Sequence, residues 1–300
     1  MKILVIGGSY FLGRVFVMQT GKEYDITVVN RGTYSMEAFG VKQVTGDRRD
    51  EATWKICAEN YDVLVDFCGY HKGDIRRVLN NLAGTIKQYI FISTVDVYEH
   101  GGYSLKTEDY PFEKRVISGD SGAYINGKID LEQELMMECS KRNISYTILR
   151  PAILYGPYNY APRESAYIQM LVKNHVLFHI TDALGKFQFV YVKDAAEAIV
   201  NSMLNKKAFG QAYNICDETI YDYSLFCEEL KKVSDVPFKE NLITLNEAML
   251  RNIPLPFPIA EAETILCNNQ KSQNELKMHY TKFPLGIAKT YRAFKKVFIS

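Results

Sequence analysis

The stretch Met1-Lys-Ile-Leu-Val-Ile-Gly-Gly-Ser-Tyr-Phe-Leu-Gly13 decides the fold. Its apolar residues 3–6 are typical of a buried parallel strand. The run breaks at Gly7, and a helical pattern begins near Phe11. In a turn of this kind glycine lets the backbone approach a phosphate, and the helix N-terminus offers free N–H groups. The stretch therefore predicts a site for a dinucleotide pyrophosphate.

Strands and helices alternate after this turn. Strands are expected at residues 25–30, 44–47, 61–67, 88–94 and 145–154. Helices are expected between them at residues 14–20, 51–59, 74–82 and 123–141. Alternation of this kind predicts an α/β fold with a doubly wound parallel sheet of the Rossmann type. We expect the dinucleotide-binding domain to comprise residues 1–154 plus 187–215. A smaller, mostly C-terminal substrate lobe would comprise residues 155–186 plus 216–300.

Composition narrows the class of protein. The 300 residues are 47% hydrophobic, which suffices for one large domain with a smaller lobe. The 36 basic and 35 acidic residues leave a net charge of +1, so no global field would attract nucleic acid or an anionic membrane. Six cysteines lie far apart without metal-ligand spacing, so we expect reduced thiols and no metal. No stretch has the length of a membrane span or signal peptide, which predicts a cytoplasmic protein.

Candidate catalytic residues follow the fifth predicted strand. Tyr124 and Lys128 are four residues apart in a predicted helix, hence on one face of it. A free tyrosine titrates near pH ~10, and a nearby cation favours its phenolate, so the pair can serve as a general acid or base. Alone the pair is also typical of a solvated surface. Thr94, at the carboxyl end of a predicted strand where a doubly wound sheet binds ligands, favours the catalytic interpretation.

Several motifs, in this order, resemble the extended short-chain dehydrogenase/reductases, the NAD-dependent epimerase/dehydratase group. They are the glycine turn, Gly46-Asp-Arg48, Ile92-Ser-Thr-Val-Asp-Val-Tyr98, Tyr124-x-x-x-Lys128, Leu149-Arg-Pro-Ala-Ile-Leu-Tyr-Gly-Pro157 and Tyr191-Val-Lys-Asp194. The glycine turn is most similar to a Gly-Gly-Thr-Arg-Phe-Leu-Gly subgroup that includes chloroplast stem-loop-binding-like proteins.

The resemblance implies a role for each matching residue. Thr94, Tyr124 and Lys128 would be catalytic, with Tyr124 exchanging the substrate proton and Lys128 lowering its pKa and holding the nicotinamide ribose. The implied cofactor-binding residues are Gly7, Ser9, Tyr10, Phe11, Leu12 and Gly13 at the pyrophosphate, Asp47 and Arg48 at the adenine, Cys68 and Gly69 at its ribose, and Pro151 and Ile153 at the nicotinamide.

Two positions depart from the family pattern. Tyr10 stands where the family usually has its second glycine, so its ring must lie over the phosphates or point away. At the end of the second strand, NAD-preferring members usually have an acid for the ribose 2′-hydroxyl, whereas this chain has Asn30 and Arg31. Asn30 would not repel a 2′-phosphate and Arg31 could pair with one, although Arg31 could equally stack on adenine. NADP is therefore slightly favoured over NAD.

The reaction type depends on the residues after Thr94. Related dehydratases follow with Asp-Glu, whereas this chain has Val95 and Asp96; Val95 cannot donate a proton, so dehydration is disfavoured, and Asp96 is a weaker candidate for substrate contact. We expect an epimerase or reductase acting by hydride transfer on a nucleotide sugar or related polyol. The alternatives are an NADP-linked reductase of a small carbonyl compound and a non-catalytic dinucleotide-sensing or RNA-binding homologue. A homodimer is left open. His71 is interpreted as incidental and Asp194 as a helix N-cap.

Overall fold

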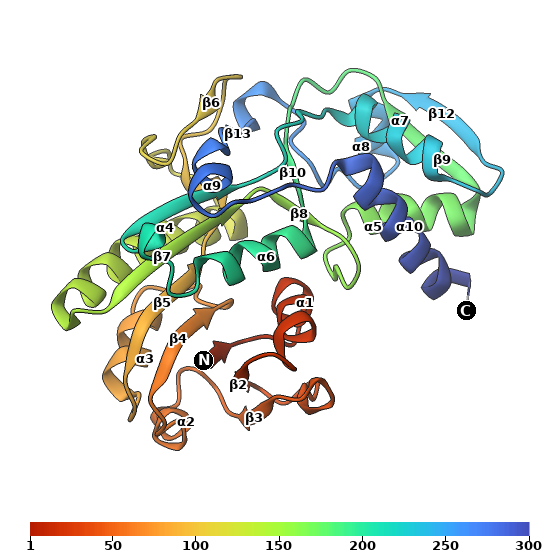
Figure 1. Ribbon diagram of the computed structural model, residues 1–300. Helices are drawn as coiled ribbons and strands as arrows, with labels where there is room; N and C mark the ends of the chain where they lie inside the picture. The colour runs from red at the N-terminus through yellow and green to blue at the C-terminus, as the bar shows by residue number, and fades with distance from the viewer. Residues whose placement is uncertain (300) are drawn as a thin grey trace.

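A seven-stranded parallel sheet forms the centre of the computed structural model, which describes residues 1–299 (Figure 1). Its strands are β1 (Lys2–Ile6), β2 (Asp25–Asn30), β3 (Lys42–Thr45), β4 (Tyr61–Asp66), β5 (Ile86–Ile92), β7 (Ser145–Pro151) and β11 (Gln211–Ile215). They lie in the order β11-β7-β5-β4-β1-β2-β3, and all the pairings are parallel. The order reverses between β1 and β4, where a doubly wound sheet opens its ligand crevice. The predicted α/β doubly wound fold is confirmed.

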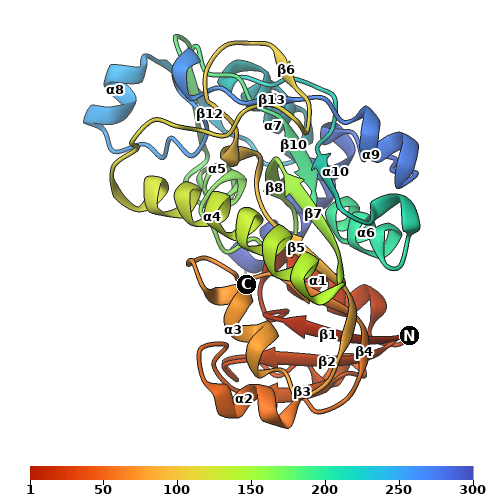
Figure 2. The same cartoon turned by 90° about the vertical axis from the view of Figure 1, so that its left-hand side faces the viewer.

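Helices cover both faces of the sheet, as Figure 2 shows. One face carries α1 (Phe11–Thr20) and α6 (Val192–Ser202), and the other carries α2 (Glu51–Ile56), α3 (Asp74–Asn81) and α4 (Gly119–Arg142). Side chains of β1 alternate between these layers: Ile3 packs in the α1 cluster and Leu4 in the cluster of α2, α3 and α4. Burial on both faces explains why β1 is apolar throughout.

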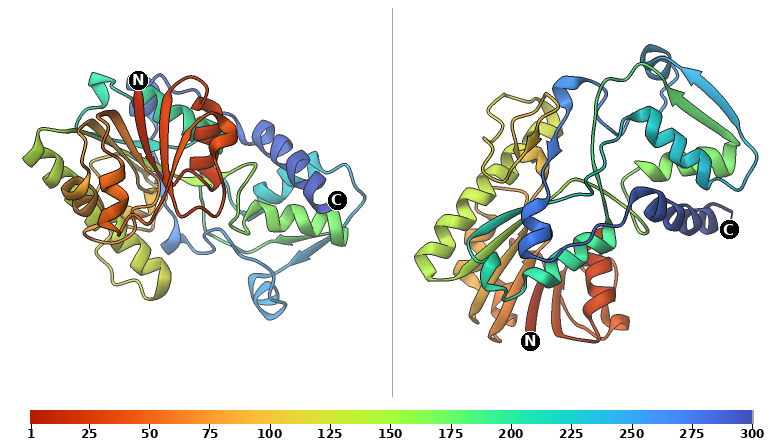
Figure 3. Two further views of the ribbon diagram at one scale, coloured as in Figure 1. Left: turned by 90° about the horizontal axis from the view of Figure 1, so that it is seen from below. Right: turned by 45° about the horizontal axis from the view of Figure 1, so that its top comes forward.

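The outer lobe is built from short parallel pairs instead of a long sheet (Figure 3). The pairs are β8 (Ile153–Tyr155) with β10 (Phe189–Tyr191), β9 (Val176–Ile180) with β12 (Lys239–Ile243), and β6 (Leu105–Lys106) with β13 (Leu266–Cys267). Its helices are α5 (Glu164–Gln169), α7 (Tyr223–Val233), α8 (Leu245–Leu250) and α10 (Phe283–Ile299), whereas α9 (Gln270–Glu275) packs against β11 of the main sheet. Single turns are η1 (Glu37–Phe39), η2 (Val95–Val97), η3 (Met170–Asn174), η4 (Lys206–Ala208) and η5 (Glu261–Glu263).

Aromatic packing gives this lobe its core. The rings of Phe189 and Phe283 stack with centroids 4.3 Å apart, and those of Phe187 and Phe257 stack at 4.8 Å. Phe189 belongs to β10, whereas Phe283 begins the last helix, so these contacts join segments that are far apart in sequence. Stacks of this kind stabilise beyond the area they bury.

Some predicted elements end differently in the structure. The strand expected at residues 145–154 is interrupted at Ala152, because its second part leaves the main sheet and pairs with β10. Asp194 is not the N-cap of its helix: α6 begins at Val192, and the Asp194 carboxylate accepts hydrogen bonds from the backbone N–H and hydroxyl of Thr281. All six cysteines are free. No helix within residues 1–299 is long and apolar enough to cross a membrane.

Candidate active site

One cavity of about 880 Å³ lies at the carboxyl ends of β1, β2, β4 and β5. Nearly all the predicted site residues line it, namely Gly7, Ser9, Tyr10, Phe11, Leu12, Gly13, Asn30, Arg31, Asp47, Arg48, Cys68, Thr94, Asp96, Tyr124, Lys128, Pro151 and Ile153. The exception is Gly69, which is buried with its α-carbon facing the Phe91 ring; a Cβ built on it would lie 3.0 Å from that ring. The structure thus brings the predicted residues together and leaves Gly69 outside.

The glycine turn, residues 7–13, forms a cradle of backbone between β1 and the start of α1. Gly8 has a φ of +78°, in the left-handed region that favours glycine. A Cβ on Gly13 would lie 2.8 Å from the α-carbon of Gly8, so only glycine allows α1 to start this close to the strand. The hydroxyl of Ser9 is buried without a hydrogen-bond partner in the described chain. A buried hydroxyl left unpaired beside a helix N-terminus fits a phosphate oxygen of a dinucleotide.

Tyr10 packs its ring against other tyrosines. It lies edge-on to Tyr34, with centroids 5.3 Å apart, and to Tyr160, at 5.8 Å. These three tyrosines come from the glycine turn, the segment after β2 and the loop after β8. Tyr10, which stands where the family usually has its second glycine, therefore contacts both the segment after β2 and the loop after β8.

The end of β2 presents one free cation. The Asn30 side chain accepts a hydrogen bond from the Gly32 backbone N–H at 2.7 Å and donates one to Gln43 at 3.3 Å. Both polar atoms of the Asn30 side chain are therefore hydrogen-bonded within the protein. Arg31 is exposed, lines the cavity and has no ion pair within residues 1–299. Of the two residues, Arg31 is the one whose side chain is available to a ligand.

Arg48 forms a buried ion pair with Asp66 and, unlike Arg31, is not free to bind a ligand. Its guanidinium donates two hydrogen bonds, of 2.8 and 2.9 Å, to the buried carboxylate of Asp66 at the end of β4. Burial raises the pKa of Asp66, but the Arg48 charge and hydrogen bonds from Arg48, Tyr89 and the Cys68 backbone together hold that pKa below its ordinary value. Arg48 therefore fixes the β4 end of the cavity, while Asp47 accepts a hydrogen bond from the backbone N–H of Arg49.

Thr94, Tyr124 and Lys128 converge at the end of β5. The Thr94 hydroxyl donates to the Asp96 carboxylate at 2.9 Å and accepts from the Asp96 backbone N–H at 3.1 Å. Lys128 is only 2% exposed, and its ammonium donates to the backbone carbonyl of Ile92 at 2.7 Å. The same ammonium lies 5.8 Å from the centroid of the Tyr124 ring. The helix face predicted from the four-residue spacing therefore points into the cavity.

The charge states differ from the sequence expectation. Burial raises the pKa of Tyr124, the Asp96 charge raises it further, and a hydrogen bond with Thr94 opposes both. The expectation that Lys128 lowers the pKa of Tyr124 is not met in this structure. Burial instead lowers the pKa of Lys128 itself to about 8. Tyr124 is therefore a neutral phenol at pH 7, prepared to donate a proton, and Lys128 is close to losing its charge.

Sequence reasoning missed several cavity residues, among them four polar side chains. Tyr70 follows β4, and its ring lies 5.0 Å from the Lys128 ammonium and 6.4 Å from the Tyr124 ring. Three others, Asn159, Tyr160 and Arg163, belong to the segment after β8. The only signal for this segment was that it directly follows the Tyr-Gly-Pro157 motif. His71, interpreted as incidental, also lines the cavity and is exposed.

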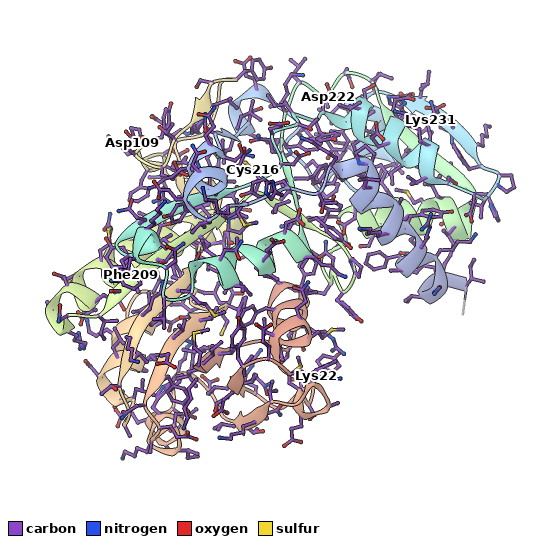
Figure 4. The ribbon with its side chains drawn as sticks, in the orientation of Figure 1. Lys22, Asp109, Phe209, Cys216, Asp222 and Lys231 are labelled. Carbon is purple, nitrogen blue, oxygen red and sulfur yellow. The ribbon has the colours of Figure 1, made fainter. Side chains whose placement is uncertain are left out.

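A metal-type cluster lies in the outer lobe. Within residues 1–299, His179, Glu228 and Glu240 bring their ligand atoms within 4.8 Å of one another. However, Lys231 places its ammonium 2.9 Å from Glu228 and 3.1 Å from Glu240 (Lys231 is labelled in Figure 4). This ammonium pairs with both carboxylates, and His179 hydrogen-bonds Glu240, so an ion network explains the cluster.

Comparison with known proteins gives a consistent result. Residues 74–216 match the NAD dependent epimerase/dehydratase family. The chain is 26% identical over 257 residues to the chloroplast stem-loop binding protein of 41 kDa b from Arabidopsis thaliana, an alignment that covers 80% of this chain and 65% of the plant protein's length.

Solved structures share the fold across the whole chain. UDP-glucuronic acid 4-epimerase from Bacillus cereus, in complex with UDP-glucuronic acid and NAD, superposes with a TM-score of 0.77 at 16% identity, covering 99% of this chain and all of the other. UDP-glucose 4-epimerase from Thermotoga maritima superposes with a TM-score of 0.79 at 17% identity, covering 99% of both chains. The glycine turn, the match over residues 74–216 and the distant plant relative therefore agree: what this chain is similar to is the NAD-dependent epimerase/dehydratase family.

Proposed function

We propose that the protein is an NAD(P)-dependent epimerase or reductase that acts by hydride transfer on a nucleotide sugar or a related polyol. The observation that carries the proposal is that the phosphate cradle and the group of Thr94, Tyr124 and Lys128 line the same cavity. Either feature alone is common, whereas a phosphate cradle and an acid–base group in one cavity are what dinucleotide-dependent proton and hydride exchange requires.

Each residue has a distinct task in this proposal. A bound nicotinamide dinucleotide supplies the acceptor and donor of a hydride. The glycine turn would hold its pyrophosphate, Lys128 its ribose, and Pro151 and Ile153 would lie at the nicotinamide. Tyr124 Oη would give its proton to a substrate carbonyl oxygen, or remove the proton of a hydroxyl, while Thr94 Oγ1 orients that oxygen. A phenol is protonated at pH 7 at its ordinary pKa of about 10, and the surroundings of Tyr124 raise that pKa further, so donation to a carbonyl is the direction for which it is prepared.

Full dehydration is not proposed. Val95 lines the cavity directly after Thr94 and carries no proton to donate. Asp96 is the nearest acid in sequence, and its carboxylate accepts the hydrogen bond of Thr94. This arrangement suits the orientation of a hydroxyl group better than the expulsion of water.

A second candidate is an NADP-linked reductase of a small carbonyl compound, and Arg31 favours it. Its unpaired guanidinium at the end of β2 could bind a ribose 2′-phosphate, so we propose a slight preference for NADP over NAD. The stem-loop binding in the name of the plant relative is not proposed for this chain, because its net charge is only +1.

The first experiment identifies the nucleotide that co-purifies with the protein and its redox state. Purified protein is then incubated with UDP-glucose or UDP-glucuronic acid and either dinucleotide, while NMR follows sugar stereochemistry and absorbance follows the reduced cofactor. An epimerase would interconvert two sugars without net change in reduced cofactor, and a reductase would consume it. A protein that binds no dinucleotide at millimolar concentration would contradict the proposal.

A further inference from the structure

Arg163 is a cation that the protein leaves unpaired inside the cavity. It is half-buried, lines the cavity and directly precedes α5. Its guanidinium forms no ion pair, hydrogen bond or cation–π contact with any residue from 1 to 299. A charge that is partly removed from water without a partner lowers the stability of the protein, which suggests that a ligand supplies the partner.

Its position is close to the group that would exchange protons. Burial raises the pKa of Tyr124, and among the groups that act against this is the positive charge of Arg163. Arg163 and Tyr124 also line the same cavity. The guanidinium therefore lies within electrostatic reach of the place where a substrate oxygen would meet Tyr124.

Neighbouring carboxylates are engaged elsewhere. Glu164 follows Arg163 in sequence, but its carboxylate accepts hydrogen bonds from the Gly156 backbone N–H at 3.0 Å and from the Asn159 side chain at 2.9 Å. Asp96 accepts the hydrogen bond of Thr94, and no ion pair joins it to Arg163. The charge of Arg163 contributes to lowering the pKa of Glu164, but no carboxylate within residues 1–299 forms an ion pair with the guanidinium.

From this arrangement we infer that Arg163 binds an anionic group of the substrate, a carboxylate or phosphate carried close to the reacting carbon, an inference that rests on the proposed function. The substrate would then be an acidic sugar or its nucleotide derivative. A planar guanidinium suits this task because it can donate two parallel hydrogen bonds to a carboxylate or a phosphate. The alternative ligand for Arg163 is the pyrophosphate of the dinucleotide. This alternative arises because Tyr160, in the same loop as Arg163, contacts Tyr10 of the glycine turn.

The test compares ligands that differ by one carboxylate. Calorimetry and ligand-detected NMR, at saturating dinucleotide, measure binding of UDP-glucuronic acid against UDP-glucose and of free glucuronate against glucose. Wild-type protein should prefer the acid of each pair by about ten- to hundredfold, the range of a charge-assisted hydrogen bond. Arg163→Gln should remove the preference without weakening the neutral sugar, and Arg163→Lys should restore part of it.

Controls separate this inference from its alternatives. Arg292→Gln removes an exposed guanidinium of α10 that has no ion pair in the described chain, and it should leave the preference unchanged. Thermal melting checks that Arg163→Gln is folded. A preference that is absent in wild type, or that survives Arg163→Gln, overturns the inference. So does a loss of dinucleotide affinity in Arg163→Gln with the sugar preference unchanged, which would assign Arg163 to the pyrophosphate. If neither UDP-sugar binds, the nucleotide-sugar proposal fails, and the free acid pair still decides the role of Arg163.

Discussion

Two loops border the cavity, and they are held in different ways. The glycine turn, residues 7–13, is held by backbone: Gly8 adopts a positive φ, and Gly13 allows the helix to start against it. The outer loop, residues 156–163, is held by the side chain of one buried acid, Glu164, which binds Gly156 and Asn159. The loops meet where Tyr10 and Tyr160 lie edge-to-face.

This difference suggests that the two loops bind different parts of the ligands. A cradle of backbone N–H groups suits the phosphates that every dinucleotide shares, whereas side chains on the outer loop can change with the substrate. We therefore expect substitutions in the glycine turn to affect cofactor binding and substitutions in the outer loop to affect substrate choice or loop stability.

The largest effect is expected in the glycine turn. Gly13→Val should abolish dinucleotide binding, because a Cβ at this position would already lie 2.8 Å from the Gly8 α-carbon and 2.9 Å from its nitrogen. Gly13→Ala should weaken binding less, since it adds the Cβ without branches. Calorimetry with NAD and NADP measures the effect, and thermal melting confirms the fold. Unchanged affinity in Gly13→Val would mean that the turn does not hold the cofactor.

The next effect separates chemistry from binding. Tyr124→Phe should lower the rate on the order of 10²–10⁴-fold, the usual contribution of a general acid or base, with dinucleotide affinity nearly intact. Lys128→Met should lower both, because Lys128 would serve the phenol and the ribose. Steady-state kinetics and calorimetry provide the two measurements. Full activity in Tyr124→Phe would mean that Tyr124 and Lys128 are a surface pair without a catalytic role.

The glycine turn was predictable because its signal is local. A strand, a glycine turn and a helix follow one another within thirteen residues, and the four-residue spacing of Tyr124 and Lys128 fixes one helix face. The outer loop carries no such signal. It reaches the cavity because the chain leaves the main sheet at Ala152 and β8 pairs with β10, a contact between segments more than thirty residues apart.

Electrostatics was predictable only in part. Neighbouring residues suggested that Lys128 would lower the pKa of Tyr124. Desolvation by the surrounding chain is instead the largest cause of both pKa shifts, and it cannot be read from spacing. Asp194 was misinterpreted for a related reason, since its partner Thr281 lies far away in sequence. Local patterns gave the elements and the cradle, whereas long-range packing determined the charge states.

A smaller effect tests cofactor choice at the end of β2. Arg31→Ala should weaken NADP binding by about ten- to hundredfold, the range for a guanidinium–phosphate hydrogen bond, and should leave NAD almost unaffected. Arg31 has no protein partner within residues 1–299, so its loss should not disturb the fold. Calorimetry with both dinucleotides checks this. Equal losses for NAD and NADP would indicate stacking on adenine, and the proposed NADP preference would be withdrawn.

The smallest effect is expected in the outer loop, where a buried acid makes loop stability depend on pH. Burial raises the pKa of Glu164 from its ordinary value of 4.5 to about 7, although hydrogen bonds from Gly156 and Asn159 oppose the shift. Because the folded protein binds the proton more tightly than the unfolded chain, this group's contribution to stability is fully present below pH 4.5. It is lost as the pH rises through about 7.

Glu164→Gln removes this titration while its amide oxygen can still accept the Gly156 hydrogen bond. The variant should therefore gain stability relative to wild type as the pH rises from about 5 to 8, by about 1–2 kcal/mol, since each unit of pKa shift corresponds to about 1.4 kcal/mol. Denaturant unfolding at both pH values measures the difference, and any cost of the altered Asn159 contact cancels because it is the same at both. The matched change Glu261→Gln, on the exposed η5 turn, should show no such pH dependence. If the two variants behave alike, the outer loop does not depend on the charge of a buried acid, and the contrast with the glycine turn is lost.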